Sequence, residues 1–184
     1  MSLAPVAPFR FFSSTAHLLN TSTSSHPCDP CNPWLFVLMK KKPPVAVRKS
    51  RLHGRGVFAT RPIRKGARIL EYTGRRVLWS SIPEDQDDLE TYYFGLDNKK
   101  EVIDPSVGGN EARWINHSCD PNCETIEDRR GRVFIKAIRS IRAGEELVYD
   151  YNLGVDVPRT KEIEQECPCY CGSSNCRGTL LAVG

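Results

Sequence analysis

Long hydrophobic runs are missing from this sequence of 184 residues. The apolar stretch WLFVLM, residues 34–39, is far shorter than the about 20 residues that a membrane-spanning helix needs. The sequence has no secretory signal, and its 13 glycines and 13 prolines are too many for a helical bundle. Because 40% of the residues are hydrophobic, one modest core can still form. We therefore expect one compact, loop-rich, soluble domain that makes no membrane contact.

Acidic residues are almost absent from the N-terminal part, where a single one precedes Lys40. Serines and threonines crowd residues 13–25 and prolines follow, so this part has little with which to build a core. Arg10 is the only Lys or Arg before Lys40, which argues against an organelle transit peptide. We predict that residues 1–43 are a disordered or non-native N-terminal extension, with Met39 as the alternative start of the protein.

The net charge of +4 is unevenly distributed. The stretch Lys40–Arg76 holds thirteen Lys or Arg and one acid, whereas Glu84–Asp104 holds eight acids and two lysines. One face could therefore meet polyanions and another could meet basic peptides, although two solvated faces of opposite charge are an equally simple interpretation. A nucleic-acid partner remains uncertain at this point.

From residue 45 onward, β-forming residues alternate or cluster between Gly and Pro breaks, as in VAVRKS, GVFAT and ARILEYTG. Two hairpins are predicted, one with its turn at DNKK and one with its turn at RRG. A helix is expected over 107–116 and a further strand over 144–151. The pattern predicts a mainly β fold of several short strands in small sheets, with short helices.

Four of the eight cysteines lie within ten residues, in CPCYCGSSNC: Cys167, Cys169, Cys171 and Cys176. A disulfide framework is one interpretation, but no secretory signal is present and C-x-C pairs are poorly spaced for bridging. A structural zinc ion needs four thiolates or imidazoles, and Cys169, Cys171 and Cys176 supply three with useful spacing. The fourth ligand stays open between Cys167, Cys123 and Cys119.

A second dense group of reactive side chains is the run Asn116, His117, Ser118, Cys119, Asp120 and Pro121. This run belongs to GNEARWINHSCDPNC at 109–123, which follows HGRGVF at 53–58 and precedes GEELVYDY at 144–151 and CYCGSSNCRGTL at 169–180. In their order and spacing, these four segments resemble the SET-domain protein-lysine methyltransferases with a post-SET zinc motif, closest to the trithorax-like branch. The resemblance implies a β-clip-like SET fold around a knot-like core, with a C-terminal zinc-bound tail.

The resemblance also implies a division of the chain and a set of ligand contacts. Residues 45–152 would be the SET domain, and residues 153–184 a linker and the post-SET zinc motif. The contacts to S-adenosyl-L-methionine would come from His53, Arg55, Gly56, Tyr92, Asn116 and His117. The Zn2+ ligands would be Cys119, Cys169, Cys171 and Cys176. Asn116 also fits an N-glycosylation acceptor, which the lack of a secretory signal disfavours, and His117 could be a structural histidine.

Three tyrosines receive roles from the same resemblance. Tyr151 would lie beside the transferring methyl group, Tyr92 would line the lysine channel, and Tyr149 would tune how many methyl groups are added. Tyr149 and Tyr151 would project to the same side of one strand. Core packing is the alternative for all three, and it is our interpretation of Tyr93. Trp114 departs from the resemblance, because the family usually has Phe at this position, and Cys167 adds a thiol beside the zinc motif.

The expected activity is transfer of methyl groups to a lysine amine of a protein or peptide, with a histone tail as one candidate. The acidic stretch 84–90 would border the substrate groove and favour a basic peptide. A catalytically weak SET-fold binding module for protein or nucleic acid is the alternative. The protein would be nuclear or chromatin-associated in a eukaryote and cytoplasmic in a bacterium.

Overall fold

The computed structural model describes three stretches of the chain: 42–82, 92–154 and 158–182. The chain divides into units 1–40 and 41–184, and every described residue belongs to the second unit. The predicted N-terminal extension, apart from its last two residues, and the acidic stretch 84–90 lie outside the described residues.

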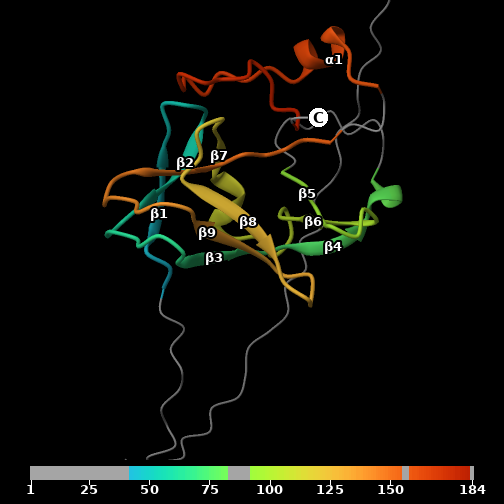
Figure 1. Cartoon of the computed structure of the whole chain (residues 1–184). Helices are drawn as coiled ribbons and strands as arrows, with labels where there is room; N and C mark the ends of the chain where they lie inside the picture. The colour runs from blue at the N-terminus through green and yellow to red at the C-terminus, as the bar shows by residue number, and fades with distance from the viewer. Residues whose placement is uncertain (1–41, 83–91, 155–157, 183–184) are drawn as a thin grey trace, which may run out of the picture. The chain divides into compact units, whose positions relative to one another are not determined.

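Short strands dominate the described part of the chain, as predicted (Figure 1). The strands are β1 (Val45–Lys49), β2 (Arg55–Ala59), β3 (Arg68–Tyr72), β4 (Arg75–Leu78), β5 (Phe94–Gly95), β6 (Glu101–Asp104), β7 (Asn116–His117), β8 (Cys123–Glu127), β9 (Val133–Ala137) and β10 (Glu146–Tyr149). The helical turns are η1 (Trp79–Ser81) and η2 (Glu111–Trp114), both 3-10, and the α-helix is α1 (Lys161–Glu166). The mainly β fold class is confirmed.

The strands form two sheets. The larger has the order β1-β2-β10-β8-β9-β3, and β7 also pairs with β10; the smaller has the order β4-β6-β5. Within the larger sheet, β10 runs antiparallel to β2 but parallel to β7 and β8, with Tyr149 in register with both His117 and Cys123. The strand β2 and the neighbouring strands β7 and β8, about sixty residues further along the chain, thus meet on one short strand.

Both predicted hairpins are confirmed. The strand β5 pairs antiparallel with β6, and β8 pairs antiparallel with β9 over five register positions. In the second turn, the Asp128 carboxylate accepts the backbone N–H groups of Arg130 and Arg132 at 2.8 and 3.0 Å. An Asp that accepts backbone N–H groups within its own turn stabilises that turn, which is why such local signals are readable from sequence.

The helix predicted over 107–116 is wrong in both type and length. Only the four-residue 3-10 turn η2 forms, with the Asn110 side chain accepting the Ala112 N–H at 3.2 Å as its cap. The chain then becomes extended at Ile115, and Asn116 and His117 pair with β10. Sheet pairing and the burial of Ile115, which is 1% exposed, therefore override the local helical preference.

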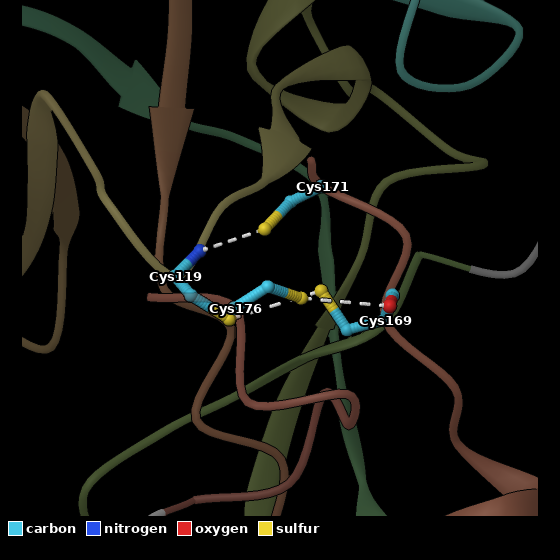
Figure 2. Close-up of side chains that lie close together, drawn as sticks. All are labelled: Cys119, Cys169, Cys171 and Cys176. Atoms are coloured by element: carbon cyan, nitrogen blue, oxygen red, sulfur yellow. Dashed lines mark hydrogen bonds between the residues drawn. The ribbon is translucent and has the colours of Figure 1, made fainter. Parts of the chain in front are cut away.

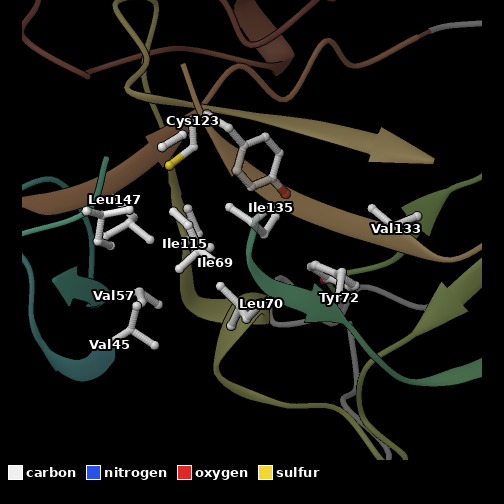
Figure 3. Close-up of a cluster of buried hydrophobic side chains, with 14 of the residues drawn as sticks. Val45, Val57, Ile69, Leu70, Tyr72, Ile115, Cys123, Val133, Ile135 and Leu147 are labelled. Carbon is white, nitrogen blue, oxygen red and sulfur yellow. The ribbon is translucent and has the colours of Figure 1, made fainter. Parts of the chain in front are cut away.

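The core fills the space between strands (Figure 3). In β9 every second residue is buried, as expected for a strand with one face against the core. Fully buried apolar side chains include Val57, Val102, Ile115, Val133, Ile135, Ile141, Leu147 and Leu181. Burial of each such side chain contributes about 1.5–3 kcal/mol before the entropy cost of folding. None of the helices in the described ranges is both long and apolar enough to cross a membrane.

Candidate functional site: a cysteine cluster and two cavities that share tyrosines

Four cysteine side chains converge on one point: Cys119, Cys169, Cys171 and Cys176 (Figure 2). All four sulfurs lie within 4.8 Å of one another, and the sulfurs of Cys119 and Cys169 are 3.8 Å apart. Zn–S bonds of about 2.3 Å in a tetrahedron place sulfurs about 3.8 Å apart, so the donor set and its size fit zinc. These four residues would hold the ion and crosslink the C-terminal tail to the segment after β7.

Local hydrogen bonds shape the tail around this cluster. The N–H of Cys169 donates to the Gly178 carbonyl at 3.1 Å, and the N–H of Cys176 donates to the Ser173 carbonyl at 3.1 Å. Gly172 has φ +70°, a left-handed conformation that lets the chain turn back between the ligands. The spacing C-x-C-x4-C is therefore a folded loop that presents three sulfurs inward.

The two other candidates for a fourth ligand do not join the group. Among the described residues, the cluster contains neither Cys123 nor Cys167. Cys123 is buried in β8 and its burial raises the pKa of its thiol to about 12, so it is an apolar core residue. All six described cysteines are free thiols, which agrees with a metal cluster in preference to a disulfide framework.

The thiols of the cluster differ in acidity. Burial raises the pKa of Cys169 to about 12, whereas at Cys171 hydrogen bonds outweigh the effect of burial and lower the pKa to about 5. These bonds come from the Ser173 hydroxyl at 3.1 Å and from the Cys119 N–H at 3.5 Å. Cys171 is thus prepared as a thiolate, the form that binds a metal.

A first cavity of about 290 Å³ lies next to the cluster. Predicted cofactor-binding and catalytic residues line it together with the tail: His53, Tyr92, Asn116, His117 and Tyr151, with Pro168, Cys169, Tyr170 and Cys171. The cavity is therefore closed on one side by the loop that the cysteines fold. In Figure 1 this C-terminal tail, coloured orange to red, lies near β2 and β7.

The side-chain amide of Asn116 organises the loop beside the cavity. It donates to the backbone carbonyls of Arg55 at 2.9 Å and His53 at 3.3 Å, and to the Glu146 carboxylate at 2.8 Å. Glu146 also accepts the Ser50 hydroxyl at 2.8 Å. One amide and one carboxylate thus fasten the loop between β1 and β2 to β10.

Gly56 is needed for this packing. A Cβ built there would lie 2.2 Å from a carboxylate oxygen of Glu146. Neither Gly56 nor Arg55 is among the described residues that line the first cavity. The Arg55 guanidinium instead lies over the Trp114 ring, 4.7 Å from its centroid. Of the predicted cofactor-binding residues, Arg55 and Gly56 therefore pack against Trp114 and Glu146 and do not line the first cavity.

His117 is a buried neutral histidine. Burial lowers the pKa of its ring, and its Nδ1 accepts the backbone N–H of Tyr151 at 3.1 Å. Asp150 lies 3.6 Å from that same nitrogen, but a nitrogen that accepts an N–H carries no proton, so the pair is not an ion pair. The other nitrogen, Nε2, lies 3.4 Å from the Cys119 sulfur, within hydrogen-bonding distance. His117 therefore links the tyrosine segment to the cluster.

A second cavity of about 480 Å³ shares Tyr92, Tyr151 and Leu180 with the first. Its wall also includes Tyr149 and the exposed ring of Trp79. Two cavities that share the same two tyrosine walls can present two molecules to each other. This arrangement suits transfer of a small group between ligands bound on either side.

The tyrosines between the cavities form a compact group. The rings of Tyr149 and Tyr151 lie 5.0 Å apart, although β10 ends at Tyr149 and Tyr151 follows it. The Tyr151 hydroxyl donates to the Ile115 carbonyl at 2.9 Å, and the Tyr72 hydroxyl donates to the Tyr92 carbonyl at 2.6 Å. Burial raises the pKa of Tyr72, Tyr149 and Tyr151, so all three remain protonated at neutral pH and act as hydroxyl groups.

Sequence reasoning missed several residues of this site. Asn122, 1% exposed, accepts the Val148 N–H at 2.9 Å and donates to the Glu146 carbonyl at 2.7 Å, which fixes the segment after Cys119 to β10. Asp150 and Arg177 pair with each other through two hydrogen bonds. Asn122, Asp150, Arg177 and Glu146 all lie within the segments that carry the family resemblance. Their place in these segments was the only sign in the sequence that they belong to the site.

The chain is similar to a known protein family and to several named proteins. The SET domain family model matches residues 54–152. A Drosophila melanogaster protein named Histone-lysine N-methyltransferase trr is 40% identical over 141 residues, which cover 72% of this chain and 6% of that protein. Human Histone-lysine N-methyltransferase 2B is 37% identical over 148 residues, 76% of this chain and 5% of that protein. The chain thus spans a small fraction of the length of these relatives.

Solved structures show the same fold. The crystal structure of KRYPTONITE in complex with mCHH DNA, an H3(1–15) peptide and SAH superposes with a TM-score of 0.61 at 31% identity, over 76% of this chain and 30% of that chain.

A Drosophila virilis protein named Histone-lysine N-methyltransferase trithorax is 37% identical over 145 residues, 74% of this chain and 4% of that protein, in line with the predicted trithorax-like resemblance. The chain belongs to the SET-domain family.

Proposed function

We propose that the chain is an S-adenosyl-L-methionine-dependent protein-lysine N-methyltransferase. The observation that carries the proposal is the pair of cavities that meet at Tyr92 and Tyr151. The first, walled by Asn116, His117 and the cysteine-bound tail, would take the methyl donor. The second would take the side chain of the substrate lysine.

The donor would supply a methyl group on a positively charged sulfur, and the chain's residues would align the amine with it. A lysine amine with an ordinary pKa near about 10.4 must lose its proton before it can attack. The buried surroundings that raise the pKa of Tyr149 and Tyr151 disfavour a charged ammonium for the same physical reason. Tyr92 and Tyr151 would then narrow the path so that nitrogen, carbon and sulfur lie in line.

Tyr151 is proposed as the residue closest to the transfer, with its hydroxyl oriented by the Ile115 carbonyl. Because its pKa is raised, it would act through hydrogen bonding and shape, and a tyrosinate base is disfavoured at neutral pH. Tyr149 would limit the space around the amine. The zinc proposed at the four cysteines would be structural, since its ligands leave no open position.

For the protein substrate we propose a histone tail. The relatives are named histone-lysine methyltransferases, one of them from Saccharomyces cerevisiae and named as H3 lysine-4 specific, and KRYPTONITE was solved with an H3(1–15) peptide. A basic, lysine-rich tail would also suit a second cavity with the aromatic rings of Tyr92, Tyr93 and Phe94 in its wall. Nuclear, chromatin-associated localisation follows from this proposal.

The test is transfer of label from methyl-labelled S-adenosyl-L-methionine to an H3(1–15) peptide and to mixed cellular protein by the full chain. We expect labelled lysine from wild type and a loss of roughly 100-fold in Tyr151→Phe, because a small misplacement of the reacting groups has an effect of this size. The melting temperature of the variant, measured in parallel, controls for its folding. Donor binding without labelling of any protein would favour the binding-module alternative.

A further inference from the structure

Arg177 joins the cysteine cluster to the segment that carries the tyrosines. It directly follows Cys176, and its backbone N–H donates to the Cys119 sulfur at 3.4 Å. Its guanidinium holds both carboxylate oxygens of Asp150, with Nη1 to Oδ2 at 2.5 Å and Nη2 to Oδ1 at 2.8 Å. One residue therefore contacts a sulfur of the cluster and the residue between Tyr149 and Tyr151.

Asp150 in turn fixes the backbone around Tyr151. Its Oδ1 accepts the N–H of Asn152 at 3.1 Å, and Asn152 has φ 46°, a left-handed conformation that asparagine tolerates better than most residues. The N–H of Tyr151 donates to His117 at 3.1 Å. Two hydrogen bonds thus fix the backbone around Tyr151, one from its own N–H to His117 and one from the N–H of Asn152 to Asp150.

The pair of Arg177 and Asp150 has the geometry of a strong contact. The two side chains are only 22% and 21% exposed, and a planar guanidinium that binds a carboxylate with two bonds fixes orientation as well as distance. The hydrogen bond from Arg177 lowers the pKa of Asp150, so the carboxylate is charged at neutral pH. The Nε of Arg177 is buried and has no hydrogen-bond partner among the described residues. The guanidinium also donates to the Leu181 carbonyl at 3.5 Å, so the two shorter bonds to Asp150 are its closest contacts.

We propose that Arg177 is a positioning residue that couples the zinc site to Tyr151. Once the metal fixes Cys176, the next residue presents its guanidinium to Asp150, and Asp150 sets the backbone that carries Tyr151. The catalytic meaning of this coupling rests on the function proposed above. Linkage requires the contact to act in both directions, so Asp150 must strengthen the equilibrium binding of zinc although it is not a ligand.

The experiment measures the equilibrium division of zinc between the full chain and a coloured chelator of known affinity, with no methyl donor present. Asp150→Asn and Arg177→Gln are each expected to bind zinc roughly tenfold more weakly than wild type. The double variant should bind zinc no more weakly than the weaker single variant, because both changes remove one contact. Arg177→Lys, which keeps the charge and loses the two-bond geometry, should lie between wild type and Arg177→Gln.

Arg159→Gln is the matched control. It removes another arginine of the tail, one that pairs with Glu164 at 2.6 Å and has no contact with Asp150, and should leave the zinc affinity at the wild-type value. A wild-type zinc affinity in Asp150→Asn, fully additive single variants, or a purified chain without zinc would each overturn the proposal. If the variants behave as expected but even wild type transfers no methyl group, the coupling stands and the proposed function fails.

Discussion

Tyr149 and Tyr151 are separated by one residue and differ in what surrounds them. Tyr151 touches both cavities, whereas Tyr149 touches the second only and is 8% exposed. A hydroxyl at that depth occupies room that a methylated amine needs when it rotates for another transfer. The two side chains are therefore expected to control different steps.

The replacement Tyr149→Phe tests this division. We expect more di- and trimethyl-lysine than wild type produces, with the rate of the first transfer kept within a few-fold, because the ring stays and only one oxygen is lost. Mass spectrometry of a methylated peptide over time measures the distribution. The assigned role is wrong if wild type already runs to trimethyl-lysine, or if the variant leaves the distribution unchanged.

Gly56 allows a second test with a single added methyl group. Gly56→Ala places a carbon 2.2 Å from a Glu146 oxygen, so the carboxylate must move away from Asn116 and the loop at His53 must shift. We expect a loss of about 1–3 kcal/mol in the free energy of unfolding and weaker binding of the methyl donor. Denaturant titration and calorimetry measure the two effects. In Gly95→Ala, where nothing lies within 4 Å of the new carbon, the unfolding free energy should change far less.

At the scale of elements, the smaller sheet depends on a buried carboxylate. Asp104 at the end of β6 is 2% exposed, pairs with Arg75 of β4 at 2.9 Å and accepts the Ser106 N–H at 2.9 Å. Burial alone would raise the pKa of Asp104, but the bonds from Ser106 and Arg75 hold it below its usual value. The carboxylate therefore stabilises the folded state in its charged form.

The sign of the pH dependence follows from this lowered pKa. The contribution of Asp104 is fully present above its unfolded-state pKa of about 3.9 and is lost as the pH falls from there through the folded-state pKa. We expect the melting temperature to drop over that range in wild type and to drop less in Asp104→Asn. Thermal melts from pH 6 to 2 measure this. Asp97→Asn, at an exposed site, is the control. If the melting temperature of this variant falls with pH as little as that of Asp104→Asn, Asp104 has no special part in the acid sensitivity.

The elements that sequence could predict are those whose causes are local. The turn at Asp128 and the alternation of buried residues in β9 are encoded within a few positions, so both hairpins were foreseen. The predicted helix over 107–116 was wrong because Asn116 and His117 pair with β10, about thirty residues further along the chain, and this pairing keeps them extended. The same distance hides the contacts of Asn116 with Glu146 and of Arg177 with Asp150, because motifs show which residues recur and not which ones touch.

At the scale of the whole molecule, the tail meets the strand-rich body through the cysteine cluster, the pair of Arg177 with Asp150, and the bridge between Leu153 and Leu181. We expect removal of zinc by a chelator to abolish methyl transfer while the far-UV circular dichroism changes little, because structural zinc stabilises mainly what it crosslinks. Metal analysis should find one zinc per chain in active protein. Full activity in Cys176→Ser, or collapse of the strand signal on chelation, would contradict this.

The order of strands in the larger sheet also has a consequence for biosynthesis. The strand β10, Glu146–Tyr149, lies between β2 and β8, so a late part of the chain fills the middle of the sheet. A nascent chain on the ribosome can close its local hairpins early, but β2 and β8 remain unpaired edges until residue 149 has emerged. During translation this domain is therefore exposed to aggregation until β10 has emerged, and a chaperone that shields open strand edges would act on it in that interval.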